Sequence, residues 1–177
     1  RNARLRSMLK NLFPNNKFKK ASSIMHQIRS IKEVEEIDAI KKACDITKNG
    51  FNRILKFIKP GIFEYNIQAE LIHEFINNCS KGFAYEPIIA SGKNACILHY
   101  IDNNQILKKD DVILMDFGAE YNNYASDLTR CVPVNGRFTT RQKNVYNAVL
   151  RVMRGAKKIL KPGVFLNDYE KRVGILM

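Results

Sequence analysis

The stretch Asp110–Val134 carries the residues whose types and spacing point most directly to chemistry. It predicts two β-strands, because an apolar run leads into Asp116 and β-type residues resume after Asp127. Asn122 and Asn123 lie between the two runs and tolerate the positive φ angles of a two-residue turn. The stretch therefore predicts a β-hairpin with one aspartate on each arm.

The register of this hairpin decides whether the two aspartates meet. With Asn122 and Asn123 as the loop, the expected pairs are Tyr121 with Tyr124, Gly118 with Asp127, and Asp116 with Thr129. Paired residues share a face, so the aspartates become diagonal neighbours roughly 7 to 8 Å apart. Carboxylates that converge in this way suit two divalent cations about 3.5 to 4 Å apart. The alternative is that both aspartates cap turns or face water, as aspartates near strand ends commonly do.

His99 is the third candidate. Ile88 and Ile89 predict one strand, and Ile97 and Leu98 predict a second strand that ends at His99. A lone histidine on a strand is usually an ordinary hydrogen-bonded residue. One in the same sheet as two converging carboxylates is a better candidate for acid–base work.

Three amphipathic helices are expected around this sheet. The first follows a capping box at Ser30–Glu33 and runs to Ile58, and the second covers about Tyr65–Cys79. The buried face of the second is expected to comprise Ile67, Leu71, Phe75 and Ile76. The third follows a capping box at Thr139–Gln142 and has a basic outer face.

A short repeat links the helices. Lys59-Pro60-Gly61 recurs as Lys161-Pro162-Gly163, each time after one long helical pattern and before another. The chain therefore predicts one full copy of a helix–turn–helix–sheet unit and the start of a second copy.

Composition narrows the class of protein. Of the 30 Lys and Arg residues, eight fall within residues 1–30, which contain no acid, so we expect a basic linker from an upstream domain there. Nucleic-acid binding is expected to be unlikely, because apolar residues interrupt this basic run. The four cysteines lack C-x-x-C spacing, and no apolar run is long enough to span a bilayer. We therefore expect a cytoplasmic protein without a membrane partner.

Three motifs in order resemble one family. They are Ala90-Ser91-Gly92-Lys93-Asn94-Ala95-Cys96-Ile97-Leu98-His99-Tyr100, Asp116-Phe117-Gly118-Ala119-Glu120-Tyr121 and Tyr124-Ala125-Ser126-Asp127-Leu128-Thr129-Arg130. Together they resemble the Xaa-Pro aminopeptidases of the pita-bread metallopeptidase superfamily. Asp116-Phe117-Gly118 also matches a protein-kinase motif, but no glycine-rich G-x-G-x-x-G loop precedes it.

The resemblance implies a fold, a site and a cofactor. The fold would be α+β, with residues 31–177 forming the N-terminal part of a truncated pita-bread catalytic domain: its first pseudo-symmetric half and the start of the second. Asp116 would bind one metal, Asp127 would bridge two, and His99 would stabilise or protonate the tetrahedral intermediate. The metal would be Mn²⁺, with Zn²⁺ or Co²⁺ as alternatives. The substrate would be a peptide with proline at its second position.

The remaining ligands of that family, one histidine and two glutamates, would lie outside this chain. We therefore expect the 177 residues to be inactive alone, to expose apolar surface and to form homo-oligomers. Two alternatives stay open: a prolidase, which accepts dipeptides, and a non-catalytic binding module with the same fold.

Overall fold

The computed structural model describes residues 2–177, which fall into two compact units that meet between Asp38 and Ala39. The first unit contains α1 (Asn2–Leu12), α2 (Ser22–Ser30) and the start of α3 (Val34–Phe57). The expected basic linker at residues 1–30 thus includes two helices, although its first residue lies outside the described residues. That it connects to an upstream domain stays a prediction.

The first turn of α3 is capped by a glutamate, not by the expected serine. Ser30 is the last residue of α2, and its hydroxyl donates back to the carbonyl of His26. The backbone N–H of Glu33 donates instead to Glu36 Oε2 at 2.8 Å. The capping box at Ser30–Glu33 was therefore wrong, because the serine satisfies the end of one helix and cannot cap the next.

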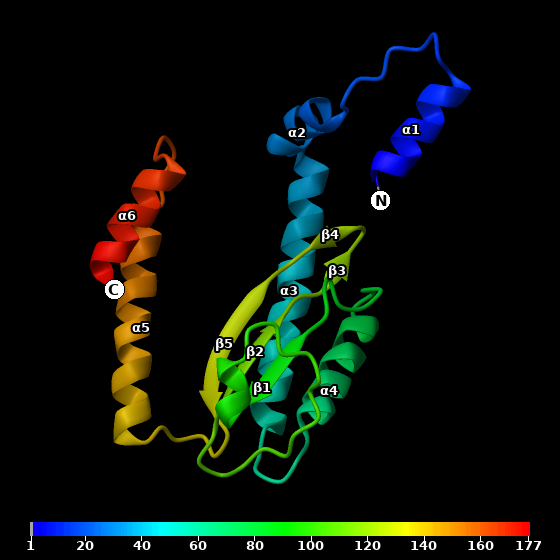
Figure 1. The fold of residues 1–177 in the computed structure, drawn as a ribbon. Coiled ribbons are helices and arrows are strands. Elements are labelled where there is room, and N and C mark those ends of the chain that lie inside the picture. The colour runs from blue at the N-terminus through cyan, green and yellow to red at the C-terminus, as the bar shows by residue number, and fades with distance from the viewer. Residues whose placement is uncertain (1) are drawn as a thin grey trace. The chain divides into compact units, whose positions relative to one another are not determined.

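The second unit combines helices with a small antiparallel sheet (Figure 1). Its sheet has the order β1-β2-β5, and β3 pairs with β4 in a separate ribbon. In chain order its remaining elements are α4 (Glu64–Asn77), β1 (Ile88–Ser91), a 3₁₀ helix (Gly92–Cys96), β2 (Val112–Phe117), β3 (Glu120–Tyr121), β4 (Tyr124–Ala125), β5 (Leu128–Pro133), α5 (Thr140–Ile159) and α6 (Leu166–Leu176).

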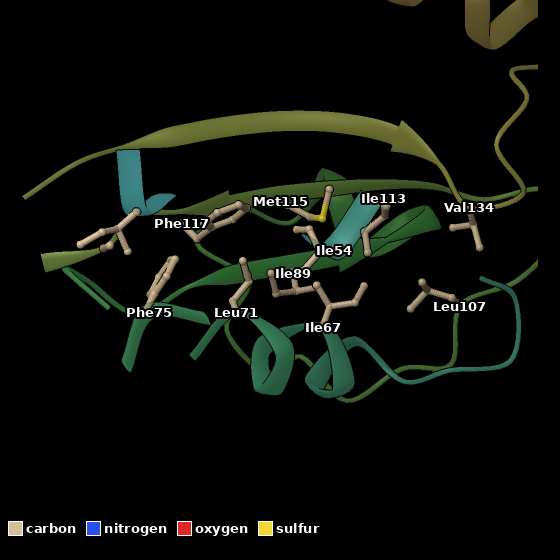
Figure 2. Close-up of a cluster of buried hydrophobic side chains, with 12 residues drawn as sticks. Ile54, Ile67, Leu71, Phe75, Ile89, Leu107, Ile113, Met115, Phe117 and Val134 are labelled. Atoms are coloured by element: carbon tan, nitrogen blue, oxygen red, sulfur yellow. The ribbon is translucent and has the colours of Figure 1, made fainter. Parts of the chain in front are cut away.

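One face of the sheet forms the core with α3 and α4 (Figure 2). Along β2 burial alternates, so that Ile113, Met115 and Phe117 are fully buried while the residues between them are half-buried. This period of two marks a strand with one covered face. Helix α4 contributes three of the four residues expected, but Ile76 is 59% exposed and that part of the prediction was wrong.

The hairpin has the register predicted from its turn. Tyr121 pairs with Tyr124, and Asp116 pairs with Thr129. Asn122 and Asn123 have φ angles of 50° and 66°, as a two-residue turn of this twist requires.

The repeat is also present in the fold. The turn after α3 has Gly61 at a φ of 90°, and the turn after α5 has Gly163 at 86°. Each turn leads into a further helix, α4 or α6. A β-carbon would be strained at such φ angles, which explains why both turns use glycine.

Helix α5 exposes apolar surface, as expected of an incomplete fold. Its capping box at Thr139 and Gln142 is formed in both directions, but none of its residues is buried. Val145, Val149 and Met153 are more than half exposed. Among residues 2–177 no helix has the length and apolar character needed to cross a bilayer. The expected self-association stays a prediction.

The substitution Gly118→Ala tests the packing of the hairpin. A β-carbon at Gly118 would lie 1.8 Å from the carbonyl oxygen of Ser126, so one arm would have to move. We expect urea unfolding to show a loss of about 3 kcal/mol. The control is Gly174→Ala in α6, where nothing lies within 4 Å. It should be neutral or stabilise by about 0.5–1 kcal/mol, and equal effects of the two variants would contradict the close approach.

Candidate metal centre

Asp116 and Asp127 converge on one tyrosine hydroxyl. The Tyr85 hydroxyl lies 2.6 Å from Asp116 Oδ1 and 3.2 Å from Asp127 Oδ1. Because both contacts end on the same oxygen, the two carboxylate oxygens are no more than about 6 Å apart. The convergence expected from the hairpin register is therefore present.

The two carboxylates lie on the open side of the sheet. Asp116 shares its face of β2 with Val112 and Leu114, opposite the core residues, and is half-buried. Asp127, just before β5, is exposed. An ion or a substrate can therefore reach both side chains without opening the core.

Tyr85 was missed in the sequence, although it contacts both aspartates. It precedes β1, whose Ile88 pairs with Asp116, so the antiparallel register brings the tyrosine next to β2. Burial, followed by the hydrogen bond to Asp116 and the charges of both aspartates, raises the pKa of Tyr85 well above its ordinary value. The hydroxyl therefore stays protonated and donates to the carboxylates. In the sequence, Tyr85 is recognisable only as a polar aromatic residue shortly before a predicted strand. Its contact with Asp116 could not be predicted without the pairing of β1 with β2.

A second hydrogen-bonded group anchors the hairpin to α3. Thr47 Oγ1 and Ser126 Oγ are 2.6 Å apart, and the backbone N–H of Ala119 donates to both, at 2.8 and 3.0 Å. Thr47 and Ser126 are buried. This group holds the two arms together at the point between Asp116 and Asp127.

His99 lies in a different setting from the one expected. The strand predicted at Ile97–His99 is absent: the chain forms a 3₁₀ helix over Gly92–Cys96 and then a turn, in which His99 has a φ of 55°. The β-branched and apolar side chains there are exposed, since the following residue, Tyr100, is the one that enters the core. His99 is therefore not in the sheet with the aspartates. Within residues 2–177 no hydrogen bond is recorded for its ring, which borders a recess beside Tyr100 and Asn104.

Tyr100 anchors the turn that contains His99. It is 7% exposed, and its hydroxyl donates to Glu64 Oε2 at 2.7 Å. Burial, with this hydrogen bond, raises the pKa of Tyr100 to about 12.

An apolar groove begins next to Asp116. It lies between the open face of β2 and β5 and one side of α5, with a volume of about 670 Å³. Thr129, the partner of Asp116 in the sheet, is part of its wall. Val145, Val149 and Met153 line the opposite side. The carboxylates thus stand at the end of a surface that is open and mostly apolar.

The side chains present fit a hard divalent cation as part of its ligand set. Two carboxylates that converge without a lysine or arginine between them favour Mg²⁺, Ca²⁺ or Mn²⁺ over softer ions. Among the described residues, no group of three or more His, Cys, Asp or Glu side chains is placed to hold a metal. Two carboxylates are fewer ligands than such an ion takes, so other ligands would have to complete the site.

Comparison with known proteins defines the class. The model of metallopeptidase family M24 matches residues 38–174, and the chain belongs to this family. It is 38% identical over 154 residues to the Xaa-Pro aminopeptidase of Escherichia coli K12, an alignment that covers 87% of this chain and 35% of the relative.

Solved structures agree with this assignment. Aminopeptidase PepP of Pseudomonas aeruginosa superposes with a TM-score of 0.87 at 37% identity, over 91% of this chain and 36% of that protein. Zinc-substituted Escherichia coli aminopeptidase P, in complex with product, superposes with a TM-score of 0.84 at 36% identity, over 87% of this chain and 35% of that protein. The chain therefore has part of the pita-bread fold and spans about a third of the length of the relatives that it matches.

The buried hydroxyl of Tyr100 predicts a dependence of stability on alkaline pH. The folded-state pKa of about 12 lies above the ordinary value of 10.0, so the stabilisation is complete below pH 10 and is lost as the pH rises toward 12. We expect the free energy of unfolding to fall less steeply in Tyr100→Phe than in the wild type over this range. Tyr65→Phe, which removes an exposed hydroxyl, is the control. Parallel pH curves for the wild type and Tyr100→Phe would contradict the prediction.

Proposed function

We propose that the protein containing this chain is a metal-dependent aminopeptidase that removes the N-terminal residue preceding proline. The observation that supports it best is the convergence of Asp116 and Asp127 on the Tyr85 hydroxyl. The M24 family is one of metallopeptidases, which implies a divalent metal, and the relatives named above are Xaa-Pro aminopeptidases. Within residues 2–177 no group of three or more ligands is placed to hold a metal, so we assign the activity to the longer protein.

Each of four residues has a separate role in this proposal. Asp116 and Asp127 would hold the divalent cations, with the bridging position that the family resemblance implies for Asp127, and their convergence on one side of the hairpin supports this. Tyr85 orients both carboxylates by donating hydrogen bonds to them, and this lessens their mutual repulsion. His99 stabilises or protonates the tetrahedral intermediate, a role compatible with an exposed imidazole.

A pair of divalent cations, when bound, supplies Lewis acidity and a water whose pKa is lowered toward neutrality. We propose Mn²⁺, since carboxylate oxygens suit this hard ion, with Zn²⁺ or Co²⁺ accepted if histidine completes the ligand set. The substrate is a peptide whose second residue is proline.

Replacing either aspartate tests the metal site. In the full-length protein, we expect Asp116→Asn and Asp127→Asn each to lower kcat by at least about 10³-fold, because an amide cannot replace the charge of a carboxylate ligand. Isothermal titration with Mn²⁺ should show weaker or lost binding in both variants. The control is Asp110→Asn, an exposed aspartate just before β2 on the same hairpin. Wild-type metal binding in Asp116→Asn or Asp127→Asn would remove that residue from the site.

The length of the substrate separates the proposed activity from its nearest alternative. Full-length protein loaded with Mn²⁺ is assayed with an Xaa-Pro-Xaa tripeptide and an Xaa-Pro dipeptide. We expect release of the first residue from the tripeptide. Cleavage of the dipeptide alone would indicate a prolidase, and cleavage of neither by folded, metal-loaded protein would indicate a binding module.

A further inference from the structure

A fully buried carboxylate lies beneath the turn that carries His99. Glu64, the first residue of α4, has no exposed surface. Its Oε1 accepts from the backbone N–H and the hydroxyl of Ser91, both at 2.7 Å, with the Asn94 amide at 3.5 Å. Its Oε2 accepts from the Tyr100 hydroxyl at 2.7 Å and from the backbone N–H of Gln105 at 3.0 Å. One side chain therefore binds both ends of segment 92–105.

This carboxylate has no cationic partner within the part of the chain that the structure describes. A buried charge is costly unless hydrogen bonds and dipoles compensate it. Here the donors around Glu64 and the N-terminal end of α4 supply that compensation. Two of the bonds go to Ser91, the last residue of β1, and the others go to Asn94, Tyr100 and Gln105. Their effect is to tie the loop that follows β1 to the end of that strand.

The loop needs such an anchor at His99. The φ of 55° there is uncommon for a residue other than glycine and persists where the surroundings enforce it. Packing of the neighbouring apolar side chains does not enforce this φ angle, because three of them are largely exposed: Ile97 (54%), Leu98 (86%) and Ile101 (54%). Tyr100 is the buried neighbour, and its hydroxyl ends on Glu64.

We propose that Glu64 is a positioning residue, which through Tyr100, Ser91 and Gln105 sets the backbone conformation at His99 and so the direction of its imidazole. This inference rests on the proposed function for the role of His99, and concerns a residue that does not touch the substrate. The direction of the His99 imidazole therefore depends on a carboxylate that is buried at the start of α4.

The geometry explains why a glutamine would not serve. Each carboxylate oxygen faces a backbone N–H, that of Ser91 or that of Gln105, and a backbone N–H cannot accept. A glutamine amide would therefore direct its own N–H₂ against a donor in either orientation. Glu64→Gln should displace one end of the loop while it preserves size and shape.

A double-mutant cycle in the full-length, metal-loaded protein tests this. We expect Glu64→Gln to lower kcat for the Xaa-Pro-Xaa tripeptide about 10- to 100-fold with KM changed less than about 3-fold. In a His99→Ala background, the same substitution should cost less than about 3-fold, because its route to the reaction is already absent. Tyr100→Phe removes one donor, and should give a smaller loss with the same dependence on His99. If Glu64→Gln does not fold, Tyr100→Phe takes its place in the double-mutant cycle.

The matched control is Ile67→Ala, a fully buried residue one turn further along α4. It should lower the free energy of unfolding yet keep kcat near the wild type well below the unfolding temperature. Equal losses of kcat from Glu64→Gln in the two backgrounds, or the same loss in Ile67→Ala, would overturn the proposal and leave a general stabilising role.

Amide hydrogen exchange gives a readout that does not need activity. Glu64→Gln should speed exchange within segment 92–105 and leave Ile113–Phe117 unchanged, and unchanged or uniformly faster exchange would overturn the inference. If the wild-type protein cleaves neither peptide, the proposed function fails, and the exchange pattern alone decides whether Glu64 fixes the His99 turn.

Discussion

The register of one hairpin is the constraint on which the candidate site depends. A side chain in a strand changes face with every residue, so a slip by one position would send Asp116 or Asp127 into the core. The turn at Asn122 and Asn123 prevents the slip because both residues adopt the positive φ angles that a two-residue loop requires. Gly118 then permits the close approach of the two arms, because a β-carbon at this position would collide with the Ser126 carbonyl oxygen. The catalytic chemistry proposed here thus begins with turn residues that do not take part in it.

Hydrogen bonds from other elements hold the same hairpin on both of its faces. Thr47 of α3 reaches Ser126 and the N–H of Ala119, which fixes the crossing point of the arms from the core side. On the open side of the sheet, the Tyr85 hydroxyl donates hydrogen bonds to the carboxylates of both arms. Among the described residues, no buried side-chain nitrogen or oxygen lacks a hydrogen-bond partner. Hydrogen bonds within the chain therefore fix the side chains on both sides of the hairpin.

Local patterns predicted the hairpin register, helices α3, α4 and α5, and the cap at Thr139, because each depends on neighbours within a few residues. The prediction failed where distant residues decide the structure. Ile97 and Leu98 have strand-forming side chains, but the burial of Tyr100 and its bond to Glu64 turn the chain away from the sheet. Tyr85 could not be found for a similar reason, as its contact with Asp116 arises from the pairing of β1 with β2. The spacing of residues along the chain predicts neither the contact between Tyr100 and Glu64 nor the contact between Tyr85 and Asp116.

The open side of the sheet connects the partial fold to the incomplete ligand set. Asp116 shares its face with the wall of an apolar groove, and α5 on the other side of that groove has no buried residue. Water at such a surface weakens the attraction between a carboxylate and a cation, because the effective dielectric constant is high. Covering the groove would bury apolar surface and dry the neighbourhood of the two aspartates in the same step. Any segment that covers this groove should therefore also strengthen metal binding at the two aspartates.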